Sequence, residues 1–228
     1  MERYTVLPAG PVREFSWNER RMSMKLYTAQ ASIGWVAHIA LEESGLDYEA
    51  VALDFSAGEQ TSDDYLKINA RARVPSLIVE QGIITETPAI LTYLAQIAPD
   101  SSLGLPDSAY EQARINEFNL YLCSTVHVAH AHKMRGYRWV DDEAARHAMT
   151  ANVPRTMTLC ADMIEERLLT TPWVHGERFT ISDPYLYRIS TWLEPDGVDV
   201  ENYPKIKAHR AAMEARDSVR AVTAFFDA

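Results

Sequence analysis

The stretch VPSLIVEQGIITETPA, residues 74–89, decides the fold of this chain. Its two short apolar runs, 76–79 and 83–85, flank Glu80-Gln81-Gly82, a pattern that predicts a β-hairpin. Thr87-Pro88 follows at once and predicts a helix start, with a hydroxyl N-cap and proline at the first helical position. We therefore expect two paired strands that lead directly into a helix.

Upstream of this hairpin, the pattern alternates between strand and helix. Residues 24–28 and 48–53 predict strands, and residues 33–44 predict a helix between them, with Gly45 as its stop. Thr61 opens a further helix in which Asp64 completes a capping-box pattern. The expected order over residues 24–100 is β-α-β-α-β-β-α.

Downstream of a linker at 101–106, residues 107–228 are helical in pattern almost throughout. The expected helices cover 109–136, 143–169, 184–194 and 205–226, and a second capping box lies at Thr180-Ile181-Ser182-Asp183. Residues 1–23 lack core periodicity and predict an extension outside the core, dispensable for ligand binding. The fold class is thus a small α/β domain followed by an all-helical domain.

Composition excludes several classes of protein. Hydrophobic residues make up 47% of the 228 residues and charged residues 24%, which is typical of a globular chain and excludes intrinsic disorder. The net charge of −10 disfavours nucleic-acid and anionic-lipid partners, and no apolar run approaches the roughly 20 residues that span a bilayer. Two cysteines without a Cys-x-x-Cys pair predict neither a disulfide framework nor a thioredoxin-type oxidoreductase, so we expect a cytoplasmic protein.

Several further motifs follow one another along the chain at characteristic spacings. They are Met24-Lys25-Leu26-Tyr27, His38-Ile39-Ala40-Leu41, Asn69, Val74-Pro75-Ser76-Leu77, Thr85-Glu86-Thr87-Pro88-Ala89-Ile90, and the segment from Gly176 to Pro184. In this order and at these spacings they resemble the soluble glutathione transferase family, and within it the bacterial beta class, with zeta-class features around Trp35. The resemblance covers nearly everything from Met24 onward and implies a thioredoxin-like domain that binds glutathione, followed by the helical domain.

For glutathione, the resemblance implies two contact regions. A cis bond before Pro75 turns the backbone of Val74 outward, so that the tripeptide pairs with it as a short added strand; an ordinary loop proline is the alternative. Glu86 and Thr87 stand where the family holds the γ-glutamyl end at a helix N-terminus, although Thr87 also fits a plain N-cap. Beta-class enzymes carry a lysine near position 55 that this chain lacks, and Arg73 is our candidate to replace its charge.

For the thiol, the resemblance points to the turn before the first helix. Ile33 falls on the beta-class cysteine and Ser32 on a zeta-type serine, so cysteine-dependent chemistry is lost and Ser32 is the candidate hydroxyl donor. A plain helix N-cap is an equally good interpretation of Ser32. Tyr27 is a lesser candidate at the reacting end of the site, and a core position in the first strand suits it better.

The long helix after the linker supplies candidates for the electrophile pocket. Ser124 and His127 are proposed to line it, with His127 at the place of a beta-class active-site histidine; a half-buried histidine between helices is the alternative. His127 and His130 share a face, but no further ligand completes a metal set, so no metal is expected. The segment 135–139, with two arginines and two aromatic residues, fits part of this pocket or a dimer rim.

The expected activity is addition of the glutathione thiolate to a small apolar electrophile, with glutathione as co-substrate. The alternative is a binding or regulatory protein of the same fold without turnover. The resemblance also implies a homodimer, because the glutathione sites of this fold lie near a subunit interface.

Overall fold

In a computed structural model of the chain, residues 24–227 are described; the expected extension at 1–23 lies outside them. The amino-terminal half forms a four-stranded sheet in the order β2-β1-β3-β4, with β1 and β2 parallel and the other neighbouring pairs antiparallel. Its elements are β1 (Met24–Thr28), α1 (Gly34–Ser44), β2 (Tyr48–Ala52), η1 (Glu59–Thr61), α2 (Asp63–Ile68), β3 (Ser76–Val79), β4 (Gly82–Thr85) and α3 (Thr87–Ile97). The expected element order is therefore confirmed.

The carboxy-terminal half is helical. Its elements are α4 (Ala109–Tyr121), η2 (Leu122–Val126), α5 (His127–Arg135), η3 (Gly136–Arg138), α6 (Glu143–Met163), η4 (Ile164–Leu168), α7 (Ser182–Ser190), η5 (Val200–Asn202), α8 (Pro204–Glu214) and α9 (Asp217–Asp227). None of the helices within 24–227 is long and apolar enough to cross a membrane.

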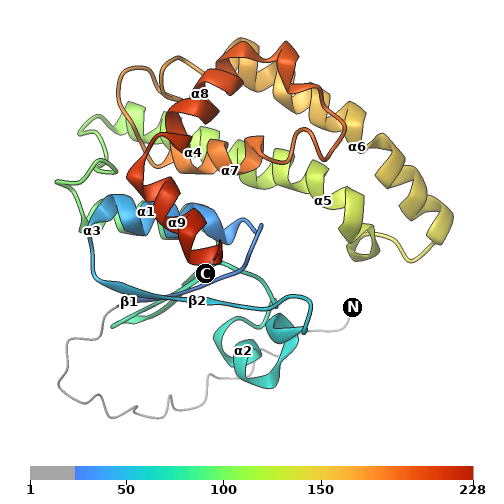
Figure 1. Cartoon of the computed structure of the whole chain (residues 1–228), viewed down its shortest axis with the longest axis horizontal. Helices are drawn as coiled ribbons and strands as arrows, with labels where there is room; N and C mark the ends of the chain where they lie inside the picture. Colours follow the sequence, from blue (N-terminus) through green and yellow to red (C-terminus); the bar gives the residue numbers. More distant parts are fainter. Residues whose placement is uncertain (1–23, 228) are drawn as a thin grey trace, which may run out of the picture.

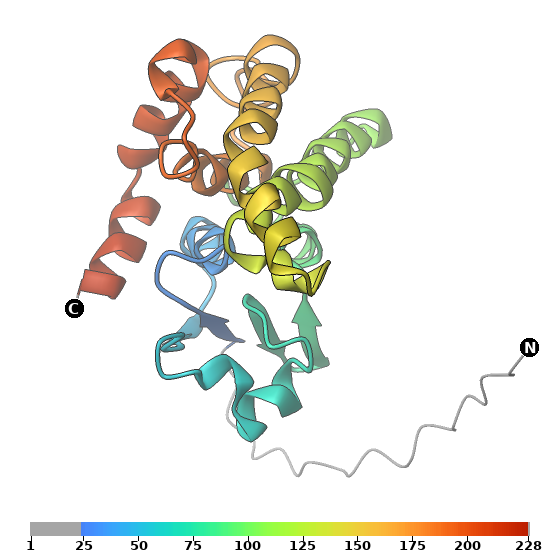
Figure 2. The same ribbon diagram turned by 90° about the vertical axis from the view of Figure 1, so that its right-hand side faces the viewer.

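Helices α1 and α3 form the layer between the sheet and the helical half, and α2 lies on the opposite side of the sheet (Figures 1 and 2). This central position explains the apolar character of α1, in which Val36, Ile39 and Leu41 are fully buried. One continuous cluster of buried side chains extends from these residues into α7, where Leu186 is also fully buried. The two halves thus share a core, and loops at their junction are held from both sides.

Several helix boundaries differ from the expected ones. The helix expected over 184–194 extends instead from Ser182 to Ser190. The helix expected over 205–226 is broken between α8 and α9, where Arg216 turns to form a two-pronged ion pair with Glu43 of α1. Ser62, rather than Thr61, caps α2, because its hydroxyl accepts the Tyr65 N–H at 3.2 Å. Helix α3 has Glu86 as its N-cap, so Thr87 is its first helical residue.

The second capping box forms as predicted and is buried. Asp183 accepts hydrogen bonds from the Thr180 N–H at 2.6 Å and the Val174 N–H at 2.8 Å, and Thr180 accepts from the Ser182 N–H at 3.3 Å. His209 of α8 contacts the same carboxylate at 3.1 Å. Asp183 therefore fixes the start of α7, the helix that positions one wall of the site described next.

Candidate functional site

Two adjoining cavities lie between the α/β half and the helical half. Both are lined by Ile33, Arg73, Val74, His127 and Arg138. The first cavity extends along the turn before α1 and along α5, and the second extends toward the start of α3, where it reaches Pro75, Glu86 and Thr87. Most residues expected from the sequence to bind glutathione are therefore brought together in one cleft.

Val74 lines the second cavity, and its backbone suits strand-like pairing with a ligand. The Val74–Pro75 bond is cis, as expected. The neighbouring carbonyl of Arg73 is already engaged, since it accepts from the Tyr65 hydroxyl at 2.6 Å and from the Asn69 amide at 2.8 Å. Within residues 24–227, by contrast, no hydrogen bond involves the N–H or the C=O of Val74. Both groups are thus available to an extended ligand.

At the start of α3, a carboxylate and free helix N–H groups face the same cavity. Glu86 adopts a positive φ of 70°, and its side chain forms an ion pair with Arg71 at 3.3 Å. Thr87 is 5% exposed and lines the cavity beside it. This end of the cleft combines an acceptor for an ammonium group with a helix N-terminus that favours a carboxylate.

Ser32 occupies the turn before α1 and lines the first cavity. Its hydroxyl donates to the Ala29 carbonyl at 2.7 Å and accepts from the Gly34 N–H at 3.0 Å. The side chain therefore caps the first turn of α1. Because the hydroxyl has a single proton, its hydrogen bond to the Ala29 carbonyl must break before it can donate to a ligand. The N–H of Ile33 has no partner among the described residues and is a second donor that sequence reasoning missed.

The structure brings only some of the side chains expected in the electrophile pocket to the cleft. From the segment 135–139, Arg135 and Arg138 line the first cavity and Trp139 lines the second. His127 lines both cavities, whereas Ser124 is not among the lining residues of either and donates instead to the Leu120 carbonyl at 2.8 Å. Cys123, its neighbour, lines the second cavity. Tyr27 also lies outside both linings and packs on the Tyr65 ring at 5.5 Å. We therefore drop Ser124 and Tyr27 from the proposed pocket.

The charged side chains that line the first cavity are cationic. Burial is the largest cause that lowers the pKa of His127, and the nearby cationic groups (His130, Arg73, Arg138 and Arg135) add to it. Together they bring this pKa to about 4, so the imidazole is neutral at pH 7. The Nδ1 of His130 lies 2.6 Å from Oδ2 of the buried Asp196 carboxylate.

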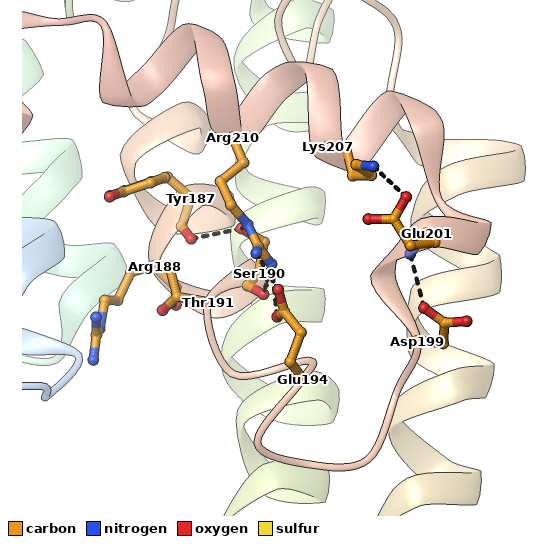
Figure 3. Close-up of polar contacts among 9 residues, drawn as sticks. All are labelled: Tyr187, Arg188, Ser190, Thr191, Glu194, Asp199, Glu201, Lys207 and Arg210. Carbon is orange, nitrogen blue, oxygen red and sulfur yellow. Dashed lines mark hydrogen bonds and ion pairs between the residues drawn. The ribbon is translucent and has the colours of Figure 1, made fainter.

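The far wall of this cavity is aromatic. Trp192, which follows α7, stacks on the His130 ring with centroids 4.1 Å apart and planes 15° apart. Arg188 of α7 reaches from beneath this tryptophan to the turn before α1, where it donates to the carbonyl of Ala31. Figure 3 shows Arg188 pointing away from its neighbours on α7 toward that turn. Nothing in the local sequence around Arg188 or Trp192 signals these contacts.

Family models match both halves of the chain. The model described as "Glutathione S-transferase, N-terminal domain" matches residues 22–96, and that described as "Glutathione S-transferase, C-terminal domain" matches residues 129–217. Both matches agree with the resemblance seen in the motifs.

The chain aligns with several individual relatives over nearly the whole length of each. A crystal structure of a glutathione transferase homolog from Sulfitobacter, with bound glutathione, superposes with a TM-score of 0.86 at 46% identity, covering 88% of this chain and 97% of that one. A beta-class glutathione S-transferase of Sphingomonas chungbukensis gives a TM-score of 0.76 at 28% identity, with coverage of 87% and 96%. A glutathione S-transferase of Escherichia coli O157:H7 is 28% identical over 199 residues, 86% of this chain and 96% of its own.

Proposed function

This chain belongs to the glutathione S-transferase family, and on that premise we propose that it binds glutathione in the cleft and transfers its thiolate to a small electrophile. One observation carries the proposal. The free backbone of Val74, the α3 N-terminus at Thr87 and the turn with Ser32 all line two cavities that share a wall. An extended tripeptide has a backbone, two carboxylates, an ammonium and a thiol, and the cleft offers a partner for each.

The proposed binding mode follows from the order of these partners. The γ-glutamyl ammonium pairs with Glu86, and its carboxylate lies against Thr87 and the N-terminus of α3. The cysteinyl backbone pairs with Val74, and the glycine carboxylate faces Arg73, which lines both cavities beside it. The thiol then lies toward Ser32 and Ile33, at the opposite end from Glu86.

At this position the protein must stabilise a thiolate. A free thiol titrates near 8.5, so about a few per cent is ionised at neutral pH. The Ser32 hydroxyl, the N–H of Ile33 and the N-terminus of α1 are the available donors. Together they lower the thiol pKa by hydrogen bonding and by the helix dipole.

The test is Ser32→Ala, assayed with glutathione and a generic aryl halide. Catalytic donation predicts that turnover at pH 7 falls by about ten- to a thousand-fold and that the bound thiolate titrates at higher pH. A capping role alone predicts a loss of about 1 kcal/mol in the free energy of unfolding with turnover per folded molecule preserved. Retention on immobilised glutathione without any turnover in the wild type would favour the alternative of a binding protein.

We further propose a homodimer. An open groove is lined by residues of both halves, from β4, α3 and α4, including Ile84, Tyr93 and Leu120, and Leu120 is 56% exposed. Glu86 lines this groove as well as the glutathione cavity, so a second copy seated there lies close to the site. A single sedimenting species at the chain mass of 25.8 kDa would refute the dimer.

The proposed location is the cytoplasm. The reaction requires reduced glutathione, which is the thiol buffer of that compartment.

A further inference from the structure

The first cavity has a charge that glutathione alone does not account for. It is bounded on one side by the turn before α1 and by Phe55, and on the other by α5, η3 and Trp192. Its lining residues include Arg73, Arg135 and Arg138 and contain no aspartate or glutamate. In a chain with a net charge of −10, three arginines around one cavity without a carboxylate are a local reversal of charge.

We propose that this cavity takes an electrophile with a flat body and a negatively charged group, and that Arg135 and Arg138 bind the charged group. The inference rests on the proposed function and narrows its substrate class. It adds one requirement to the small electrophile expected from the sequence: an anionic substituent, such as a carboxylate, away from the reacting carbon.

The two arginines are available for such a ligand. Among the described residues, neither Arg135 nor Arg138 forms an ion pair or a side-chain hydrogen bond with another residue; Arg138 lies 5.9 Å from the centroid of the neighbouring Tyr137 ring. By contrast, Arg71, Arg114 and Arg216 are each paired with a carboxylate. Guanidinium groups bind carboxylates through two parallel hydrogen bonds, which gives both affinity and orientation.

Glutathione does not occupy these two side chains in the proposed binding mode. Its two carboxylates face Thr87 and Arg73, both on the α/β half. Arg135 ends α5 and Arg138 ends η3, so both belong to the helical half across the cleft. A basic residue at a helix C-terminus complements the helix dipole wherever it points. Here both side chains also line the cavity, where an anion gains from them directly.

Aromatic rings line the cavity between the two arginines and the proposed position of the thiol. Trp192 is 7% exposed and is held by the stacked His130 ring, and Phe55 lies across the same cavity. The neutral imidazole of His127 lies 5.1 Å from the Trp192 ring, centroid to centroid, and adds a polar group without adding charge at pH 7. Rings of this kind favour a planar, conjugated ligand through stacking.

A matched pair of substrates tests the charge requirement: 4-chloro-3,5-dinitrobenzoate and the corresponding benzamide. In both reactions the glutathione sulfur forms a bond to the aryl carbon, the carbon–chlorine bond breaks with its electron pair on chloride, and the thiol proton passes to solvent. Each kcat/KM is divided by the uncatalysed rate with glutathione, so that intrinsic reactivity cancels. The wild type should then prefer the benzoate by about tenfold or more, the range for one hydrogen bond to a charged group.

The variants are Arg135→Gln, Arg138→Gln and the double variant, with Arg155→Gln on the exposed side of α6 as the matched control. The preference should fall in each single variant, approach one in the double variant, and persist in the control. It should also shrink as salt is added, because screening weakens the attraction. A wild type without preference, or a preference that the double variant retains, would overturn the proposal.

Failure of the proposed function gives a different result. If neither substrate reacts, calorimetry with 3,5-dinitrobenzoate and 3,5-dinitrobenzamide, each added to the glutathione-saturated protein, decides the matter. Tighter binding of the benzoate that is lost in the double variant supports the anion site while refuting transferase activity. Equal binding of both compounds, or binding of neither, refutes the anion site as well.

Discussion

Replacing Arg188 by methionine should reduce catalysis more than a loss of stability explains. Arg188 is 8% exposed, and its guanidinium lies 5.0 Å from the centroid of the Trp35 ring and 5.9 Å from that of Trp192. It also donates to the carbonyl of Ala31. Burial lowers the pKa of Arg188 to about 10, so the side chain is charged at pH 7. One cation thus joins α1, the turn that carries Ser32, and the aromatic wall of the cavity.

The magnitude follows from these contacts. A hydrogen bond from a charged donor contributes about 1.5–3 kcal/mol, and each cation–π contact about 0.5–1 kcal/mol. Against this, methionine removes a buried charge and keeps most of the apolar contact, which offsets part of the loss. We expect the free energy of unfolding to fall by about 1–3 kcal/mol, a shift in Tm of about 2–12 °C for a chain of this size.

Catalysis should suffer separately because Ala31 is held in a left-handed conformation, at φ 55°. This conformation is unfavourable for a residue with a Cβ, by about 1 kcal/mol, and the bond from Arg188 helps to hold it. Without that bond the turn relaxes and Ser32 moves relative to the thiol. Since a displacement of about 1 Å can cost a hundredfold in rate, we expect kcat/KM to fall at least tenfold at temperatures where the variant is folded.

The matched control is Arg210→Met, which removes an arginine of α8 that takes part in the polar contacts between α7 and α8. Arg210 pairs with Glu194 and bonds to Ser190, on the side of α7 that Figure 3 shows facing away from the turn before α1. It should lose stability and keep its kcat/KM. Steady-state kinetics and thermal melts on both variants give the comparison. If Arg188→Met keeps kcat/KM within threefold of the wild type while its Tm falls, Arg188 contributes only to stability.

Three further outcomes are expected. Glu43→Gln should lower Tm at neutral pH. Burial raises the pKa of Glu43, but hydrogen bonds from Arg216 and two serines lower it more, so the folded-state pKa lies below the ordinary value of 4.5. The stability that this carboxylate contributes is therefore present above pH 4.5 and is lost as the pH falls through the folded-state pKa, where the melting curves of variant and wild type should converge. Asp183→Ala should lower the free energy of unfolding in urea by about 3 kcal/mol or more, because several buried donors lose their acceptor. Glu86→Ala should raise the calorimetric Kd for glutathione by about tenfold and Thr87→Ala by less, with little change in Tm; unchanged affinity in both would place the γ-glutamyl end elsewhere.

The parts of the fold that sequence predicted are those that local patterns encode. The hairpin at 76–85 and the capping box at Thr180–Asp183 each need only neighbouring residues, and both are present. The α8–α9 break was missed for the opposite reason. Residues 205–226 keep helical periodicity, and the break coincides with the pairing of Arg216 with Glu43, more than a hundred and seventy residues earlier, a contact that no local pattern shows.

The same distinction applies to the site. The resemblance identified Val74, Glu86 and Thr87 because the family holds these motifs at fixed spacing, and they do line one cavity. For the helix after the linker it indicated Ser124, whereas the neighbouring Cys123 lines the cavity; both residues lie in the π-helical turn η2, which no local pattern predicts. The segment 135–139, which contains Arg138, is a candidate for the pocket from the sequence alone, and Arg138 lines the first cavity. Trp192 could not be inferred as a neighbour of Ser32, since only the packing of the two halves brings it there.

The absence of a cysteine at position 33 limits the chemistry open to this cleft. Burial raises the pKa of Cys123, the thiol that lines the second cavity, and burial also raises that of Cys160, so neither is a thiolate at neutral pH. The nucleophile must then be the sulfur of glutathione itself. Ile33 places an apolar side chain beside it, which excludes water and by itself raises the thiol pKa. In the proposed binding mode, the Ser32 hydroxyl, the α1 N-terminus and the arginines of the first cavity all lower this pKa. The positive charge that we propose attracts an anionic electrophile would then also favour the thiolate that attacks it.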